Sequence, residues 1–134
     1  MVRMTGVTDE PPMRRMCVAR GTLLGAPHTL ASDVLASART AAVFAVKDSG
    51  RLLPAAPPFS LTETFCDLDW DGKVHGWTAT VTVVGYARSS LDTAALAGVG
   101  AALLQLWEST KAGDAAASLT MRATDFHVVQ NVDG

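Results

Sequence analysis

Residues 60–87 read SLTETFCDLDWDGKVHGWTATVTVVGYA, and this stretch decides the fold. Asp71-Gly72 separates two runs rich in β-branched and aromatic residues, 60–70 and 74–87, which is the strongest short signal for a β-hairpin. In the second run, threonines alternate with apolar residues, so one strand face is apolar. The residues of that apolar face are Trp77, Ala79, Val81 and Val83.

The sequence before this hairpin predicts one strand followed by one helix. Residues 16–24 alternate weakly between apolar and polar positions, as a first strand does. Ser32 is a suitable N-cap for a helix whose apolar residues recur at helical spacing as far as Lys47, and Gly50 can end it in a left-handed conformation. Residues 51–58 contain three prolines and predict an irregular loop.

The sequence after the hairpin predicts a second helix and a last strand. Ser89 and Ser90 can cap a helix that runs to about Ala112 and is closed by Gly113. Residues 119–130 then alternate as a strand does. The order β-α-β-β-α-β predicts a ferredoxin-like α+β fold, with an antiparallel sheet and two helices on one face.

Length and charge indicate one domain that assembles with other copies. Residues 1–14 are polar and predict an N-terminal arm, and residues 15–134 predict a single domain. Charged residues make up 18% of the chain, below a typical share of about 25%. The second helix carries no charge over residues 93–107, and a helix that is apolar all round is buried all round. This predicts a subunit interface; a soluble alanine-rich helix with a harmless exposed face is the alternative.

Net charge, apolar runs and the positions of cysteine and histidine exclude several functional classes. The net charge of −2 gives no basic footprint for nucleic acid, and no run of about 18 apolar residues would span a membrane. Residues 1–16 contain no apolar core of a secretory signal, and Cys17 and Cys66 are expected to be reduced thiols in a cytoplasmic protein. The three histidines fit no metal-ligand spacing, so no metal site is expected.

Five charged residues of the two predicted helices are candidates for chemistry. Arg39 and Lys47 are about 80° apart around the helix axis and can face one cleft. Asp92 opens the second helix, and Glu108 and Lys111 are neighbours near its end. Each also has an ordinary explanation as a helix-end charge or a surface ion pair.

Two stretches resemble the cyclic pyranopterin monophosphate synthases of molybdenum cofactor biosynthesis, the molybdenum cofactor biosynthesis protein C family. Residues 32–47 (SDVLASARTAAVFAVK) and the following LLPAAPPFSL are similar to the family's G-D-V-L-A-T-A-R-I-A-G-I-x-A-A-K helix and its L-I-P-L-C-H-P-L loop. The opening MTGVT with Arg15 resembles the family's M-V-D-V-S start. In the second helix, Lys111 matches the family's lysine, and Glu108 stands for its aspartate.

The resemblance implies a fold, an assembly and a reaction. The fold is ferredoxin-like, and the assembly is a homo-oligomer, a hexamer built as a trimer of dimers with active sites at subunit interfaces. The small-molecule reaction rearranges 3′,8-cyclised GTP to cyclic pyranopterin monophosphate and releases pyrophosphate by acid–base catalysis, without a cofactor. The residues expected to be catalytic are Lys47, Lys111, Asp92 and Glu108. The residues expected to bind substrate are Arg39, Arg15, Ala56 and Pro57.

Departures from the family motifs predict altered chemistry. Pro57 stands where the family has its catalytic histidine, and Ala56 replaces the neighbouring cysteine. The family's E-M-E becomes residues 92–94 (DTA), and its phosphate-binding K-S-G-G-K-S-G segment is replaced by residues 127–131 (HVVQN). We therefore expect a homologue repurposed as a cyclase, isomerase or lyase in specialised metabolism. A non-catalytic scaffold paralogue and a true synthase are the alternatives.

Overall fold

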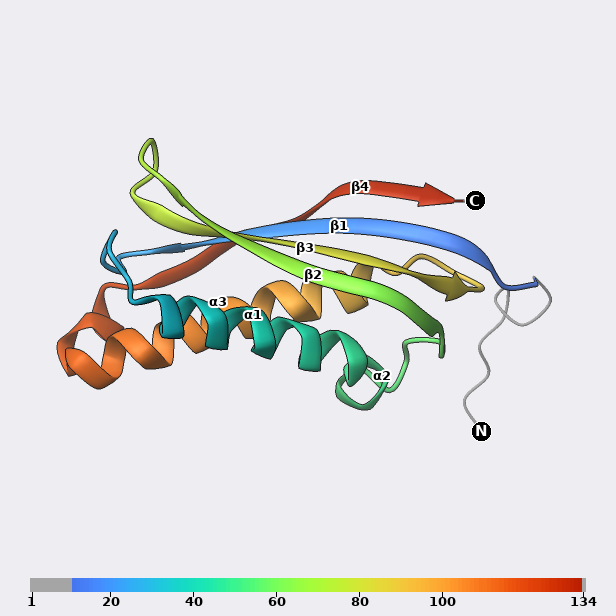
Figure 1. Cartoon of the computed structure of the whole chain (residues 1–134), viewed down its shortest axis with the longest axis horizontal. Coiled ribbons are helices and arrows are strands. Elements are labelled where there is room, and N and C mark those ends of the chain that lie inside the picture. The colour runs from blue at the N-terminus through green and yellow to red at the C-terminus, as the bar shows by residue number, and fades with distance from the viewer. Residues whose placement is uncertain (1–10, 134) are drawn as a thin grey trace.

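Four antiparallel strands form one sheet in the order β2-β3-β1-β4 in a computed structural model that describes residues 11–133. The strands are β1 (Met13–Leu24), β2 (Ser60–Asp71), β3 (Gly76–Ala87) and β4 (Arg122–Asp133). The helices are α1 (Ser32–Lys47), the short α2 (Ser49–Leu52), α3 (Asp92–Gly113) and the 3-10 helix η1 (Ala115–Leu119). Figure 1 shows α1 and α3 side by side below the sheet, which is the predicted ferredoxin-like arrangement.

The hairpin faces agree with the prediction, and its turn does not. Ala79, Val81 and Val83 are fully buried against the helices, as the alternation predicts. The turn is residues 72–75 rather than Asp71-Gly72 alone, because β2 continues through Asp71 and β3 begins at Gly76. The Asp71 carboxylate accepts the backbone N–H of Lys73 at 2.9 Å, which stabilises this longer turn.

The first helix has the predicted span but different ends. Ala31 is the N-cap and Ser32 is the first helical residue, and no side-chain hydrogen bond caps this end among the described residues. Gly50 does not end α1, because the chain turns at Asp48 and Gly50 lies inside α2. The buried Ser49 donates its hydroxyl to the carbonyl of Val46 at 2.9 Å, which fixes this change of direction.

The second long helix also differs at its ends. Leu91 is its N-cap, and Ser90 contributes by accepting the backbone N–H of Asp92 at 3.2 Å. Gly113 is the last helical residue, and Asp114 follows it in an extended conformation.

The outer bounds of the sheet differ from the expected ones. β1 begins at Met13 rather than at residue 16, so it includes the last two residues that the sequence assigned to the N-terminal arm. Residues 1–10 of that arm lie outside the described residues. The predicted last strand was placed too early: its expected first residue, Leu119, ends η1 and is 86% exposed, and β4 starts at Arg122.

A glycine sets how closely α3 approaches α1 and the sheet. A Cβ atom at Gly98 would lie 2.9 Å from a methyl of Val46 on α1 and 3.0 Å from a methyl of Val81 on β3. Real Cβ atoms rarely come so near, so a larger residue would push the layers apart. Around this contact, Leu103 and Leu106 are fully buried between the helices and the sheet.

Candidate functional site

The direction of the two helices divides the candidate residues between two ends of the domain. α1 and α3 lie side by side and run in opposite directions (Figure 1). Ala45 and Leu53, near the end of α1, line one hollow with Thr93 at the start of α3. Asp33, at the start of α1, lines another hollow with Gln105 from the second half of α3.

We name the two ends by their lysines. The Lys47 end comprises Arg15, Lys47, Asp92 and the loop of residues 53–59. The Lys111 end comprises Glu108, Lys111 and the start of α1. A helix of 16 residues is about 24 Å long, so α1 separates these ends by more than the reach of any side chain. One chain does not bring the predicted lysine pair together.

Asp92 is half-buried at the Lys47 end. One of its carboxylate oxygens accepts the backbone N–H of Thr93 at 2.8 Å. Burial, and to a lesser extent the negative charge of Asp92, raise the pKa of the Cys17 thiol on β1 to about 11. The carboxylate therefore lies within electrostatic reach of the inner face of β1.

The loop of residues 53–59 folds back on itself beside the end of β3. The backbone N–H of Ala56 donates to the carbonyl of Leu53 at 2.9 Å, and Ala56 and Pro57 are half-buried. The next two residues help to form a hollow of about 360 Å³ at the edge of β3. Its lining residues are Pro12, Pro58, Phe59, Ser60, Tyr86, Ala87 and Arg88.

Two polar side chains of this hollow are not among the residues predicted from the sequence to form the site: Tyr86 is a weaker candidate there, and Arg88 is not considered. Tyr86 is half-exposed at the end of β3, and Arg88 follows in the connection to α3. These two residues stand where a strand ends and the connection to a helix with an acidic first turn begins. Polar residues in such connections are a signal for a functional site, because connecting segments often carry functional groups. Pro57 itself brings neither a charge nor a hydrogen-bond donor to this loop.

Arg15 is held inside the chain. Its guanidinium donates to the carbonyls of Ala87 at 3.1 Å and Arg88 at 3.2 Å, and it forms an ion pair with Asp133 at 2.6 Å. The Arg15 side chain is 9% exposed. Its donors therefore serve three partners within the chain.

Arg39 lies away from both ends, on the side of α1 that faces β2. It lines a hollow of about 300 Å³ with Thr64, Phe65 and Cys66, and Lys47 is not one of the described residues that line it. Burial and the charge of Asp67 raise the pKa of Cys66 to about 11, and Arg39 opposes this increase.

The Lys111 end carries an ion pair and a further cation. Lys111 Nζ lies 2.8 Å from Glu108 Oε1; the Glu108 side chain is exposed, and that of Lys111 is half-exposed. Arg122 begins β4 after the short η1, opposite Leu24 at the end of β1. A cation, a carboxylate and a second cation at one end of the domain can bind an anionic group and move a proton.

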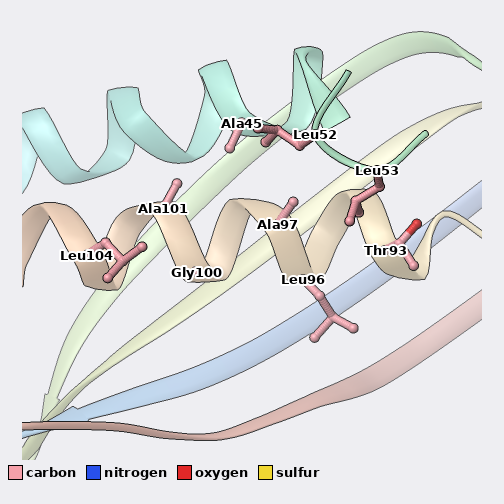
Figure 2. A pocket seen from close by; sticks show the side chains of 9 residues that line it. All are labelled: Ala45, Leu52, Leu53, Thr93, Leu96, Ala97, Gly100, Ala101 and Leu104. Atoms are coloured by element: carbon pink, nitrogen blue, oxygen red, sulfur yellow. The ribbon is translucent and has the colours of Figure 1, made fainter. Parts of the chain in front are cut away.

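A hollow of about 420 Å³ beside the end of α1 is apolar. It lies between the end of α1, α2 and α3, and Figure 2 shows the small residues Ala97, Gly100 and Ala101 on the α3 side. Leu52 and Leu104 at its borders are each 60% exposed. The uncharged helix predicted to be buried all round is thus partly uncovered in one chain. Acidic and basic side chains are absent from the described lining, so this hollow is unsuited to a charged substrate.

Among the described residues, no helix has both the length and the hydropathy needed to cross a membrane.

Comparison with known proteins points to one family over almost the whole chain. Residues 4–134 match the MoaC family. A protein of Methanospirillum hungatei, named as a probable cyclic pyranopterin monophosphate synthase, is 36% identical over 124 residues, covering 84% of this chain and 76% of that protein. The cyclic pyranopterin monophosphate synthase of Dinoroseobacter shibae is 32% identical over 126 residues, with 87% and 80% covered.

A third relative carries a different name. This protein, from Methanothermobacter thermautotrophicus, is called a probable cyclic pyranopterin monophosphate synthase accessory protein. It is 33% identical over 119 residues, which cover 82% of this chain and 74% of the relative.

Proposed function

Because the chain belongs to the MoaC family, we propose that it is an acid–base enzyme for a small molecule, whose first candidate substrate is 3′,8-cyclised GTP. The product would be cyclic pyranopterin monophosphate, with release of pyrophosphate. The similarity to proteins named as synthases over more than four-fifths of the chain carries this proposal. We propose that the enzyme works in the cytoplasm, where its two free cysteines stay reduced.

The proposed active site is shared between two copies of the chain. Lys47 and Asp92 lie at one end of the helical layer, and Glu108 and Lys111 lie at the other. A site that contains all four groups therefore needs the Lys47 end of one copy and the Lys111 end of another. The exposed apolar hollow beside Lys47 offers surface for this contact, and closed symmetry would give a hexamer built as a trimer of dimers.

Each residue has a defined role in the proposed reaction. Lys47 and Lys111 bind the phosphate groups and supply positive charge where negative charge develops. Asp92 and Glu108 accept and return protons during ring rearrangement, and the Glu108–Lys111 pair orients both members. Arg39, Ala56 and Pro57 are proposed to line the approach to this site.

Two observations favour a second candidate function, that of a repurposed cyclase, isomerase or lyase. Pro57 has no group that transfers a proton, and Ala94 follows Asp92 where the family has a second glutamate. Loss of one general acid or base typically costs about 10²–10⁴-fold in rate. A less charged substrate of specialised metabolism would need fewer of these groups.

A third candidate, a non-catalytic subunit, is favoured by the relative named as an accessory protein. Such a chain would assemble with a sister chain that carries the histidine and both glutamates. Co-purification with that sister chain, and the absence of turnover by the chain alone, would support this candidate.

The deciding experiment is an assay of the purified chain with 3′,8-cyclised GTP. We expect pyrophosphate release and a product with the mass of cyclic pyranopterin monophosphate, both lost in Lys47→Ala. A Pro57→His variant tests the changed loop: if only the histidine is missing, turnover rises. Absence of turnover in both proteins, together with failure to rescue a strain that lacks the synthase, would reject the first candidate.

A further inference from the structure

Two separate sets of side-chain contacts tie the last strand to the start of α3 and to the connection that leads into it. The first set is centred on Arg15 of β1, which forms an ion pair with Asp133 of β4 at 2.6 Å. The same guanidinium donates to the carbonyls of Ala87 and Arg88, where β3 leads into the connection to α3. Three segments that are remote in sequence thus meet at one buried cation.

The second set runs from β4 to the backbone of Asp92. The Asn131 side-chain amide donates to Ser90 Oγ at 2.8 Å. The same Ser90 oxygen accepts the backbone N–H of Asp92 at 3.2 Å. Two hydrogen bonds therefore join the C-terminal strand to the first residue of α3.

Both sets arise on the face of the sheet that meets the helices. Arg15 pairs in register with Asp133, and Cys17 pairs with Asn131, so the two ties are two residues apart along the same strands. Cys17 is fully buried under the helical layer, which identifies this face. The ties therefore lie under the start of α3.

We propose that Arg15 and Asn131 are positioning residues that hold the start of α3, and with it the carboxylate of Asp92, in its working place. Their link to catalysis rests on the proposed function, which assigns proton transfer to Asp92. In this proposal Arg15 acts through Asp92, because its guanidinium already donates to three partners inside the chain.

These contacts matter because the first turn of a helix opens easily when nothing holds it. Main-chain N–H groups at a helix start have no partners within the helix, so the first turn frays unless neighbours hold it. A shift of about 1 Å in a catalytic group can lower the rate by about 10²-fold. Residues that remove this freedom raise turnover without contacting substrate.

The test uses Asn131→Ala and Asp133→Ala in the full chain, because replacement of the buried Arg15 could prevent folding. Amide hydrogen exchange at Asp92 and Thr93 is measured first, and this readout needs no substrate. We expect exchange there to quicken about tenfold in each variant, as the first turn opens more often. Residues 98–106 should be unchanged. Gln130→Ala, on the opposite face of β4, is the matched control and should exchange as the wild type does.

Kinetics with 3′,8-cyclised GTP then separate positioning from binding. We expect kcat to fall about tenfold while KM stays within about twofold, and Asp133→Glu to recover most of the loss in Asp133→Ala. Unchanged exchange at Asp92 and Thr93 overturns the proposal, and so does faster exchange with unchanged kcat. A rise in KM alone would show that these residues bind substrate, which also overturns it. If the wild type lacks turnover, the proposed function fails, and the exchange result still decides whether the ties hold the start of α3.

Discussion

Lys47 and Lys111 end two neighbouring helices that run in opposite directions, so the two lysines lie at opposite ends of the helical layer. Both match the family motif, and both are needed in the proposed reaction. Their separation within one chain therefore bears on how copies of the chain assemble. An active site that contains both lysines has to take them from different copies.

Subunit complementation follows from this separation. Lys47→Ala and Lys111→Ala are each expected to be inactive alone, because every shared site lacks one lysine. In a mixed oligomer, a site that takes Lys47 from one variant and Lys111 from the other is intact. Random assembly of equal amounts restores about one quarter of the sites. Activity of the mixture is measured after co-refolding.

The control for this prediction is the double variant, Lys47→Ala with Lys111→Ala on one chain. Co-refolded with either single variant, it forms no intact shared site and should stay inactive. A mixture of the two single variants that also stays inactive, while forming normal oligomers, would show that one chain supplies both lysines.

Charge on the exposed apolar surface of α3 should break the oligomer. Leu104 is 60% exposed beside the apolar hollow, and Leu104→Lys would bury an unpaired ammonium in a subunit contact. We expect a smaller species by light scattering coupled to gel filtration. Leu119→Lys is the matched control, since Leu119 is 86% exposed on η1 and should leave the mass unchanged. Equal masses for wild type and Leu104→Lys would place the contact elsewhere.

Two glycines of α3 should respond in opposite ways to alanine. Gly98→Ala places a Cβ atom 2.9 Å from Val46 and should lower the free energy of unfolding by about 1–3 kcal/mol. At Gly100 the nearest atom to a Cβ would be 3.6 Å away, on Phe126. Gly100→Ala should therefore raise the free energy of unfolding by about 0.5–1 kcal/mol through helix propensity. Urea unfolding of both variants checks the pair, and destabilisation of equal size would contradict the packing argument.

The stability of the protein should fall between pH 9 and pH 11. Burial raises the pKa of Cys17 and of Cys66 from 9.0 to about 11. In this range the unfolded thiols have lost their protons and the folded thiols keep them, so the unfolded state binds fewer protons. The free energy of unfolding therefore decreases as pH rises, by on the order of 2 kcal/mol for each thiol, and the full contribution is present below pH 9.

Cysteine variants isolate this effect from other alkaline titrations. Cys17→Ala with Cys66→Ala should show a shallower decrease than the wild type when urea unfolding is compared at pH 8, 9, 10 and 11. Parallel curves for the two proteins would mean that the thiols titrate alike in the folded and unfolded states.

The fold could be predicted from the sequence because its signals are local. Alternation around Ala79 and Val81 identified the buried face of β3, and helical spacing gave the span of α1. The hairpin turn was predicted too short, because its length depends on where the strands stop pairing and on the Asp71 side chain. The ends of helices and strands were likewise less predictable than their presence, because the ends depend on contacts that the local sequence does not show.

The site was less predictable because its contacts are remote in sequence. Arg15 finds its partners 72, 73 and 118 positions away, at Ala87, Arg88 and Asp133. No local pattern reports such contacts, so the sequence alone could not predict this internal tie. Spacing along a single helix likewise predicts which residues share a face of that helix. The separation of Lys47 from Lys111 depends instead on how the two helices are placed on the sheet.

The position of β1 has a consequence for how the chain folds as it is made. β1 is synthesised early, yet its sheet neighbours are β3 and β4, and its Arg15 pairs with Asp133 118 positions later. One edge of β1 stays open until β4 has left the ribosome, and an open strand edge pairs readily with other chains. Contacts between distant segments also slow folding relative to helical domains of similar size. The nascent chain is therefore most exposed to misassembly just before its last strand arrives.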